Sequence, residues 1–581
     1  MSKKLNSSIK QRIIIVQILI VAAIFLLGAR SFDIQIFKAK VLTKKAENDY
    51  SRYITIKGER GQIFDRKMSK LATSIDAISI TACPQKINNP ENTAKKLSKI
   101  LSIDKKNLQK TLSTNNMFAW VKRRVSPDQA RQIKKLNLQG IYFENDSKRF
   151  YPNTNLAAQV IGFTGNDNNG LEGLEFKYNS VLEGSALKIK IKQDGNGGIL
   201  NLDKKQKANL KGNSIVLSID KKIQFLSEQT LERTVKNHRA KSGMALVMRP
   251  QTGEILSIAH FPEFNPNNFK IYDNTFFRNR AVTDAFEPGS AMKVFTAAAA
   301  LEKGFAPKSI FFCENGTYRI GTFTIHDTHP YAWLSINQII KLSSNIGTAK
   351  IAQTIGEKTL HNYLVDFGFG NKTKIASPGE TSGRLIPYKR WSKIDTGAIS
   401  FGQGVSVSAI QLLSGVSAIA NNGKLMKPML IKKIVSSNGK ILRTYHPKAI
   451  RQVISERSAL QVKNMMGLVV EGDGTGIKAA IKGYSICGKT GTAQKAMKSR
   501  KGYSKNRYIS VFAGFAPKDN PQLAILVVVD EPRREYYGGD VAAPAFKTIM
   551  AESFNYLNIA PEKTKPQKET NTLIASITPG E

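Results

Sequence analysis

Cysteine, histidine and acidic residues are scarce in this 581-residue chain, and each shortage excludes or disfavours a class of protein. Three cysteines, at positions 83, 313 and 487, are too few and too widely spaced for a disulfide framework or a cysteine-rich zinc module. Six histidines make a histidine-dependent enzyme possible without favouring one. The 44 Asp and Glu residues face 87 Lys and Arg residues, which gives a formal net charge of +43. Such a surface attracts polyanions, but charge alone cannot choose among nucleic acid, anionic lipid and acidic wall polymers.

The composition is otherwise that of a folded protein. Apolar residues make up 41% of the chain, enough to bury a sizeable core, which excludes global disorder. The length predicts two or three domains rather than one. No internal repeat is apparent in the sequence.

One long apolar run, residues 13–29, lies near the N-terminus and is interrupted only by Gln17. As a helix it is about 25 Å long, just enough to cross a bilayer core. A cut after Ala29 would put Leu27 where a signal peptidase needs a small residue, so we predict an uncleaved signal anchor, with a cleaved signal peptide as the alternative. Basic residues flank both ends of the run, so their distribution does not decide the orientation. The opposite orientation would export only a twelve-residue tail, so we expect residues 1–12 in the cytoplasm and the rest of the chain outside the inner membrane.

The rest of the chain is predicted to form two domains and a tail. Residues 30–211 are expected to contain a stalk and a non-catalytic domain, in which short β-type runs mix with amphipathic helices. Within them, 194–198 is rich in glycine and 204–212 is polar and basic, which predicts a hairpin and a linker. The second domain is placed at 212–560, and 561–581 is expected to be a disordered tail.

A serine followed three residues later by a lysine stands at the start of a predicted helix. In FEPGSAMK (286–293), Pro288 and Gly289 break the chain before an alanine-rich helix over 291–303. Ser290 and Lys293 then lie on one helix face, one turn apart. Burial and the positive end of a helix lower the pKa of a lysine, so that it can act as the base for a serine nucleophile. The same spacing recurs five times elsewhere, and only the chain break before an apolar helix singles out Ser290.

Two further polar motifs follow in the same predicted domain. Ser343, Ser344 and Asn345 supply hydroxyls and an amide that can relay a proton and hold a substrate carbonyl, although a polar helix start explains them equally. The segment KTGT (489–492) contains the one Lys-Thr-Gly in the chain. On a strand edge it offers an ammonium, two hydroxyls and a glycine that lets a substrate backbone approach, which suits a free carboxylate.

The last motif also overlaps a nucleotide-binding pattern. GYSICGKT (483–490) matches the Walker A consensus, and LVVVDE (526–531) resembles a Walker B strand. A phosphate-binding loop is a glycine-rich turn that opens a helix, whereas Tyr-Ser-Ile-Cys is strand-like and the Gly-Thr that follows starts a helix poorly. We therefore predict a strand here and no nucleotide binding.

The order Ser-x-x-Lys, Ser-x-Asn and Lys-Thr-Gly is typical of penicillin-binding proteins and class A β-lactamases. The chain resembles a class B penicillin-binding protein, a peptidoglycan D,D-transpeptidase, most of all the division-specific (FtsI) type. The resemblance covers about residues 60–546, and its further motifs are RGQIFDR (60–66), RFYP (149–152), GLEGLE (170–175), SFGQGVSV (400–407), YYGG (536–539) and APAF (543–546). It implies an α/β serine acyl-transferase domain of the penicillin-binding/β-lactamase type, with an antiparallel sheet and helices, plus a β-rich N-terminal pedestal and one transmembrane helix.

The resemblance assigns the catalytic roles. Ser290 is expected to attack the penultimate D-Ala carbonyl of a stem peptide, with Lys293, unprotonated, taking its proton. Ser343 is expected to relay protons to the leaving amine with electrostatic support from Lys489. Asn345 is expected to position the donor amide.

It also assigns the substrate-binding residues. The hydroxyls of Thr490 and Thr492, on either side of Gly491, are expected to hold the terminal carboxylate. Backbone N–H groups of Ser290 and Thr492 are expected to form the oxyanion hole. A neighbouring stem-peptide amine then closes the cross-link, and β-lactams, which mimic D-Ala-D-Ala, are expected to trap Ser290.

The resemblance implies no cofactor and no nucleic acid. The expected partners are peptidoglycan stem peptides, a SEDS-type glycosyltransferase, other divisome proteins and, covalently, β-lactams. The cluster of His326, Asp327 and His329 with Cys313 could bind zinc, but its spacing is irregular and loop polarity explains it as well, so no metal is predicted. The basic segment 495–507 is either a mobile loop near the active site or a plain solvated hairpin.

Other functions stay open on the sequence alone. An elongation-type class B transpeptidase would keep the same motifs. A D,D-carboxypeptidase or β-lactamase-like hydrolase would keep the nucleophile and use water as acceptor. A basic wall- or nucleic-acid-binding protein would form no covalent adduct with penicillin.

Overall fold

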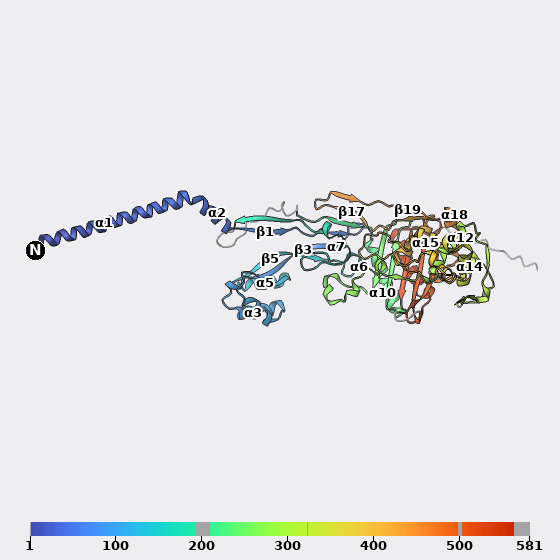
Figure 1. Ribbon diagram of the computed structural model, residues 1–581. Coiled ribbons are helices and arrows are strands. Elements are labelled where there is room, and N and C mark those ends of the chain that lie inside the picture. Colours follow the sequence, from blue (N-terminus) through green and yellow to red (C-terminus); the bar gives the residue numbers. More distant parts are fainter. Residues whose placement is uncertain (1, 193–209, 322, 498–501, 563–581) are drawn as a thin grey trace, which may run out of the picture. The chain divides into compact units, whose positions relative to one another are not determined.

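The computed structural model describes residues 2–192, 210–321, 323–497 and 502–562 (Figure 1). The chain divides into two compact units, Met1–Glu59 with Gly184–Lys211 and Arg60–Glu183 with Gly212–Glu581. The hairpin predicted at 194–198, most of the linker predicted at 204–212 and residues 563–581 of the predicted tail lie outside the described residues.

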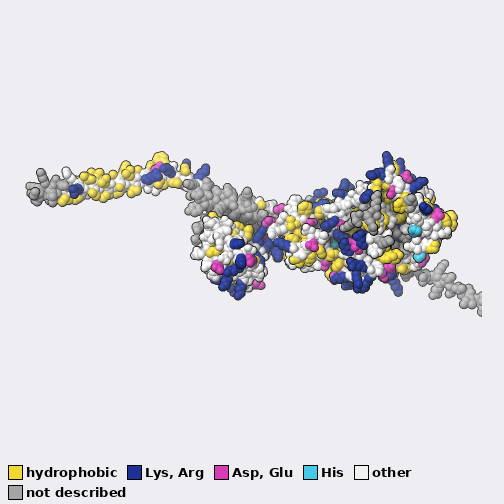
Figure 2. Space-filling model, turned by 60° about the horizontal axis from the view of Figure 1, so that its bottom comes forward, with side chains coloured by type: hydrophobic (Ala, Val, Ile, Leu, Met, Phe, Trp, Pro, Cys, Tyr) yellow, Lys and Arg dark blue, Asp and Glu magenta, His cyan; other side chains and the backbone are white. Residues whose placement is uncertain are grey.

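The first unit contains a long N-terminal helix and a two-stranded ribbon. Its elements are α1 (Ser2–Phe32), η1 (Asp33–Phe37), α2 (Ala39–Tyr50) and β1 (Ser51–Lys57), which pairs antiparallel with β6 (Ala186–Lys192). Among the described residues, one stretch, Ile9–Phe37, is long and apolar enough to cross a membrane, and its 29 residues extend about 44 Å as a helix. Its apolar side chains are exposed and appear yellow in Figure 2. This stretch includes the span predicted at 13–29.

A seven-stranded sheet joins the early and late parts of the second unit. The strand order is β18-β17-β7-β2-β3-β4, and β5 also pairs with β3. The strands are β2 (Ile63–Phe64), β3 (Lys70–Ala82), β4 (Ala119–Val125), β5 (Ile141–Phe150), β7 (Ser214–Leu217), β17 (Ile431–Val435) and β18 (Ile441–Thr444). Strand β2 precedes the segment Gly184–Lys211 in the sequence, and β7 follows it. Because β2 pairs in parallel with β7, the two parts of the second unit share one sheet.

Three helices accompany the β3–β4–β5 part of this sheet. They are α3 (Pro90–Leu101), α4 (Lys105–Leu112) and α5 (Pro127–Lys135). Local sequence starts two of them: Pro90 and Pro127 occupy first helical positions, directly after the capping residues Asn89 and Ser126. Their apolar faces form a separate small core with the sheet. The pedestal expected to be β-rich therefore also has a substantial helical part.

A buried ionic cluster explains three of the N-terminal motifs. Arg60 Nε donates to Glu175 Oε2 at 2.6 Å, and Arg149 Nε donates to Glu175 Oε1 at 2.7 Å. The three side chains are 2% exposed or less. Arg60 also donates to the Asn168 carbonyl and to Asn179 Oδ1. Buried charge is tolerated only when it is paired and hydrogen-bonded, so these residues serve structure in the 60–183 region.

A five-stranded antiparallel sheet, β20-β21-β22-β8-β9, forms the centre of the C-terminal part. Its strands are β8 (Ser242–Met248), β9 (Ile255–Phe261), β20 (Cys487–Ala496), β21 (Tyr503–Ala516) and β22 (Leu523–Asp530). Every residue of β8 and β22 is buried, because helices cover both faces of the sheet. The covering helices are α10 (Lys221–Asn237) and α19 (Gly538–Leu557) against one core, and α17 (Ala409–Ala420) against the other.

Helix α12 (Lys293–Glu302) runs through the larger core and is buried from its first residue to Leu301. It packs against α13 (Ile336–Leu342), α14 (Asn345–Ile355) and α18 (Glu456–Leu468). The helix predicted over 291–303 is therefore present, but its first residues form a 3-10 turn, because Pro288 and the left-handed Gly289 precede them. The predicted combination of an antiparallel sheet with helices is confirmed.

Candidate active site

Ser290 lies in a tight 3-10 turn, η5 (Gly289–Met292), between strand β10 (Ala285–Phe286) and helix α12. Gly289 has φ +53°, and a Cβ there would stand 2.8 Å from the carbonyl oxygen of Thr492. The turn therefore requires glycine and holds the nucleophile segment against β20. Ser290 is half-buried, and within the described part of the chain its hydroxyl has no hydrogen-bond partner.

Lys293 is the first residue of α12 and is fully buried. Its Nζ lies 2.5 Å from the Ser343 carbonyl oxygen, 2.7 Å from Asn345 Oδ1 and 3.2 Å from Ser343 Oγ. Lys293 thus directs its hydrogen bonds to the second motif, and none joins it to Ser290 among the described residues. Burial lowers the pKa of Lys293 to about 7, and the Asp327 carboxylate opposes this effect. A large fraction of the amine is therefore neutral near physiological pH, as a general base requires.

Ser343 occupies the turn between α13 and α14 with φ +62°. This left-handed conformation is unfavourable for a residue other than glycine by roughly 1–2 kcal/mol, and such strain is often found at functional sites. The next residue, Ser344, caps α14 by accepting the Gly347 N–H at 2.9 Å. The motif is therefore both a polar helix start and an arrangement that turns Ser343 and Asn345 toward Lys293.

Asp327 holds this turn in place. Its Oδ1 accepts the N–H groups of Asn345 at 2.5 Å and Ile346 at 3.1 Å, and its Oδ2 accepts the Ser344 hydroxyl at 2.5 Å. A carboxylate at the N-terminus of α14 also interacts favourably with the helix dipole. Sequence reasoning missed this role, because a cap that comes from a distant segment leaves no local spacing signal.

The candidate zinc cluster does not assemble. In the described residues, no group of three or more His, Cys, Asp and Glu side chains is placed to hold a metal ion. His326 and His329 are exposed, whereas Cys313 is buried with its Sγ 3.6 Å from Ser344 Oγ. Asp327 is committed to the start of α14.

Lys489 also contacts Ser343. It lies on β20 and is 1% exposed, and its Nζ is 2.9 Å from Ser343 Oγ, 3.2 Å from the Thr490 carbonyl oxygen and 3.3 Å from Thr490 Oγ1. Burial, together with the nearby Lys293 ammonium, lowers the pKa of Lys489 well below its usual range. Charge on either amine disfavours charge on the other, and both amines contact the Ser343 hydroxyl.

The other residues of the KTGT motif (489–492) lie on β20 as well. Thr490 Oγ1 lies 2.9 Å from Thr475 Oγ1, a contact that sequence reasoning missed. A Cβ on Gly491 would stand 2.6 Å from the Pro288 carbonyl oxygen, so this glycine keeps β20 close to the nucleophile turn. Thr492 Oγ1 accepts the Gly538 N–H at 3.0 Å, which leaves its proton free to donate to a ligand. The Walker-like segment enters strand β20 and opens no helix, in agreement with the sequence prediction.

A second missed residue, Glu287, stands three positions before Ser290. Its Oε1 accepts the Gly404 N–H at 3.0 Å and the Tyr503 hydroxyl at 3.2 Å, and burial raises the pKa of this carboxyl group. Tyr503 begins β21, so one side of the basic segment 495–507 contacts the nucleophile segment. At its other side, Lys495 is ion-paired with Asp530 at 2.8 Å. Residues 498–501 of this segment lie outside the described residues.

Comparison with known proteins agrees with this geometry. The profile of the penicillin-binding protein transpeptidase domain matches residues 243–551, and that of the penicillin-binding protein dimerisation domain matches residues 55–217. A probable peptidoglycan D,D-transpeptidase PenA of Neisseria meningitidis is 36% identical over 541 residues, which cover 92% of this chain and 91% of the relative. The peptidoglycan D,D-transpeptidase FtsI of Escherichia coli K12 is 33% identical over 552 residues, 94% of this chain and 91% of the relative.

Solved structures give the same result. Penicillin-binding protein 3 of Mycobacterium tuberculosis, solved in complex with aztreonam, superposes with a TM-score of 0.69 at 27% identity, covering 87% of this chain and 98% of that one. A peptidoglycan synthetase from Bifidobacterium adolescentis gives a TM-score of 0.70 at 25% identity, covering 89% and 98%. The resemblance read from the sequence is confirmed: the chain belongs to the penicillin-binding protein family and combines its transpeptidase domain with its dimerisation domain.

Proposed function

We propose that this protein is a class B D,D-transpeptidase that cross-links peptidoglycan stem peptides during septal wall synthesis through an acyl-enzyme on Ser290. The observation that carries the proposal is the meeting of two buried amines, Lys293 and Lys489, at the Ser343 hydroxyl. A site of this kind exchanges protons with a serine nucleophile without histidine or metal. The relatives named as D,D-transpeptidases, 36% and 33% identical over more than nine-tenths of the chain, support the assignment.

Acylation uses the free hydroxyl of the nucleophile turn. Ser290 Oγ attacks the carbonyl carbon of the penultimate D-Ala, and its proton passes to the neutral Lys293 amine. The N–H groups of Ser290 and Thr492 stabilise the oxyanion, and loss of one such donor typically costs about 10²–10³ in rate. Collapse of the intermediate breaks the amide bond, and the leaving D-Ala amine takes a proton through the Ser343 hydroxyl, which contacts both lysines.

Strand β20 orients the donor peptide. The Thr490 and Thr492 hydroxyls donate to the terminal carboxylate, with Lys489 nearby as the electrostatic partner. Thr475 supports Thr490 through the 2.9 Å contact between their hydroxyls. Asn345 holds the donor amide with a side chain whose Nδ2 is already oriented by the His326 carbonyl at 2.9 Å.

Deacylation repeats the same steps in reverse with a different amine. A stem-peptide amine from a neighbouring strand attacks the Ser290 ester and gives up one proton, through the Ser343 hydroxyl, to the lysine pair. The Ser290 alkoxide that leaves takes a proton from Lys293, so the lysine pair ends with the protons it started with. The products are the cross-linked peptide and free enzyme. Water as the acceptor would make the protein a carboxypeptidase instead.

We place the protein in the inner membrane as a single-pass protein. The stretch Ile9–Phe37 supports this placement, with residues 1–12 in the cytoplasm, 13–29 in the bilayer and the catalytic domain outside. The proposed domain limits are 30–211 for the stalk and pedestal and 212–560 for the transpeptidase domain. The pedestal would contact a SEDS-type glycosyltransferase and other divisome proteins.

Penicillin labelling tests the catalytic assignment. Full-length protein incubated with fluorescent penicillin should form a long-lived adduct, and mass mapping should place it on the peptide that contains Ser290. Ser290→Ala should abolish labelling while leaving the thermal unfolding profile unchanged. Labelling of the alanine variant would refute the nucleophile, and rapid turnover of the adduct would indicate a β-lactamase.

Depletion in the native host tests the septal role. Cells that lose a septal transpeptidase continue to elongate and should form filaments. Round cells would instead assign the protein to elongation, with the same chemistry at Ser290.

A further inference from the structure

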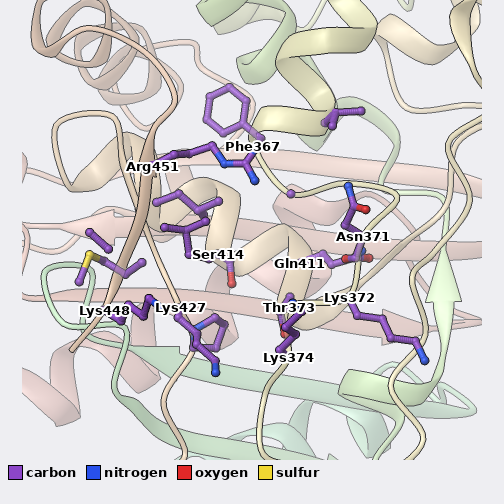
Figure 3. A pocket seen from close by; sticks show the side chains of 17 residues that line it. Phe367, Asn371, Lys372, Thr373, Lys374, Gln411, Ser414, Lys427, Lys448 and Arg451 are labelled. Atoms are coloured by element: carbon purple, nitrogen blue, oxygen red, sulfur yellow. The ribbon is translucent and has the colours of Figure 1, made fainter. Parts of the chain in front are cut away.

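A basic pocket of about 570 Å³ lies in the transpeptidase domain apart from the hydroxyl and amine network. It is formed by the segment after helix α15 (Glu357–Asp366), by α17 and by the strands β16 (Lys424–Met426) and β19 (Ala449–Gln452), which pair antiparallel (Figure 3). Its volume is in the range of sites that enclose a small ligand of a few residues. None of its lining residues belongs to the site around Ser343.

Four lysines are among the residues that line this basic pocket. Lys372 and Lys374 come from the segment after α15, and Lys427 and Lys448 come from the other side, as Figure 3 shows. Within the described residues, none of these four ammonium groups has an ion-pair or hydrogen-bond partner. Arg451 adds a fifth cation, paired with Asp366 at 2.9 Å.

The carboxylate of Glu380 lies in the same segment as Lys372 and Lys374 without forming an ion pair with either ammonium group, among the described residues. Glu380 is occupied by the loop itself: its carboxylate accepts the Thr373 N–H at 2.6 Å, the Thr373 hydroxyl at 2.5 Å and the Lys374 N–H at 3.0 Å. The four lysines outnumber this one carboxylate, their like charges repel one another, and an anionic ligand relieves that repulsion.

Part of the wall of the basic pocket is apolar. They include Phe367, Leu425, Met426, Pro428 and Ala449. A bare inorganic anion gains nothing from such walls, because it keeps its hydration shell. A ligand that combines small apolar groups with two or more carboxylates gains from both the apolar part of the wall and the lysines.

We infer that the basic pocket binds a short acidic peptide of the stem-peptide class, as a second site on the same peptidoglycan strand. This inference rests on the proposed function, which supplies a substrate with alanine side chains and free carboxylates. A second attachment point on one strand raises the effective concentration of the next stem peptide at Ser290. The pocket therefore serves the retention of polymeric substrate and not the chemical step.

Binding to acylated enzyme tests the inference. Full-length protein in detergent is first treated with penicillin, so that Ser290 is covered, and then titrated by calorimetry with soluble muramyl pentapeptide. We expect saturable binding that the double variant Lys427→Glu/Lys448→Glu weakens about tenfold and that added salt also weakens. The matched control is Lys96→Glu/Lys106→Glu, two lysines of the pedestal helices, which should bind as the unmodified protein does.

The alternative outcomes are distinct. No saturable binding, or equal binding by the pocket variant and the unmodified protein, would overturn the inference. Inorganic pyrophosphate that binds as tightly as the peptide would show a simple anion site and overturn the peptide assignment. The rate of penicillin labelling in each sample reports separately on the proposed function. Normal labelling without peptide binding rejects the second site alone. Failure of the unmodified protein to label rejects the proposed function.

Discussion

The buried Lys293 amine makes a quantitative prediction about the pH dependence of Ser290 acylation. Burial lowers the pKa of Lys293 to about 7, so about half of the molecules carry a neutral amine at pH 7 and about a tenth at pH 6. If Ser290 reacts only with the amine unprotonated, the second-order rate constant for acylation by penicillin rises about tenfold between pH 5 and pH 6. It then levels off above about pH 8.

An ordinary lysine would give a different profile. With a pKa of about 10.4, it would be neutral in about one molecule in 2,500 at pH 7, and the rate would still climb about tenfold per unit at pH 9. The neutral fractions differ by about three orders of magnitude at pH 7, so the shape of the curve alone separates the two cases. Rapid-mixing measurements with fluorescent penicillin and full-length protein from pH 5 to pH 9 give that shape.

The variant Asp327→Asn tests the electrostatic part of this account. The Asp327 carboxylate opposes the effect of burial on the pKa of Lys293, and asparagine keeps an acceptor for the helix N–H groups without the charge. We therefore expect the rising limb of the profile to move to lower pH. Glu314→Gln is the matched control, because Glu314 pairs with Lys350 at 2.5 Å and is not a cause of the Lys293 shift.

Two results would refute the reasoning. A rate that is flat from pH 5 to pH 8, or one that still climbs steeply at pH 9, excludes Lys293 as the base with a lowered pKa. Movement of the limb to higher pH in Asp327→Asn, or an equal shift in Glu314→Gln, excludes the carboxylate as the opposing charge.

Three further predictions follow from the packing. Glu175→Ala leaves the buried guanidinium groups of Arg60 and Arg149 without their carboxylate, and urea unfolding should show a loss of about 3–5 kcal/mol; a loss below about 1 kcal/mol would contradict the cluster's role. Gly491→Ala places a Cβ 2.6 Å from the Pro288 carbonyl oxygen and should slow penicillin labelling at least about tenfold, because a misplacement of about 1 Å can cost about 10² in rate. Gly467→Ala, whose nearest atom is 3.9 Å away, is its control, and equal slowing in both would count against the steric argument. Thr475→Val removes the hydroxyl partner of Thr490 and should lower the acylation rate constant about fivefold to tenfold with unchanged stability, whereas an unaltered constant would show that Thr490 orients without it.

Local sequence signals predicted several of the elements, and these signals share one property: they act over a few residues. The break at Pro288 and Gly289 predicted that Ser290 stands at the start of an apolar helix, because chain geometry there depends on the break itself. The strand-like Tyr-Ser-Ile-Cys predicted that the Walker-like segment enters β20, because a phosphate loop would need a different backbone. For the apolar run at 13–29, length and composition alone predicted a helix long enough to cross a membrane.

What the sequence did not predict depends on long-range contacts. Asp327 caps a helix that begins 18 residues later, Thr475 meets Thr490, and Tyr503 reaches Glu287 from 216 residues away. The left-handed conformation of Ser343 is equally invisible, because serine has no local preference for it and the surrounding fold imposes it. Family resemblance supplied the roles of Asn345 and the threonines, and geometry alone would have left them open.

The parallel pairing of β2 with β7 has a practical consequence for anyone who trims this protein. A fragment that starts at Gly212 would lose Ile63 and Phe64 and expose the backbone of β7 along an edge that is rich in isoleucine, valine and leucine. Uncovered edges of this kind recruit other chains. Soluble catalytic preparations should therefore begin before residue 60, and the shorter fragment is expected to aggregate even though it contains Ser290, Lys293, Ser343 and Lys489.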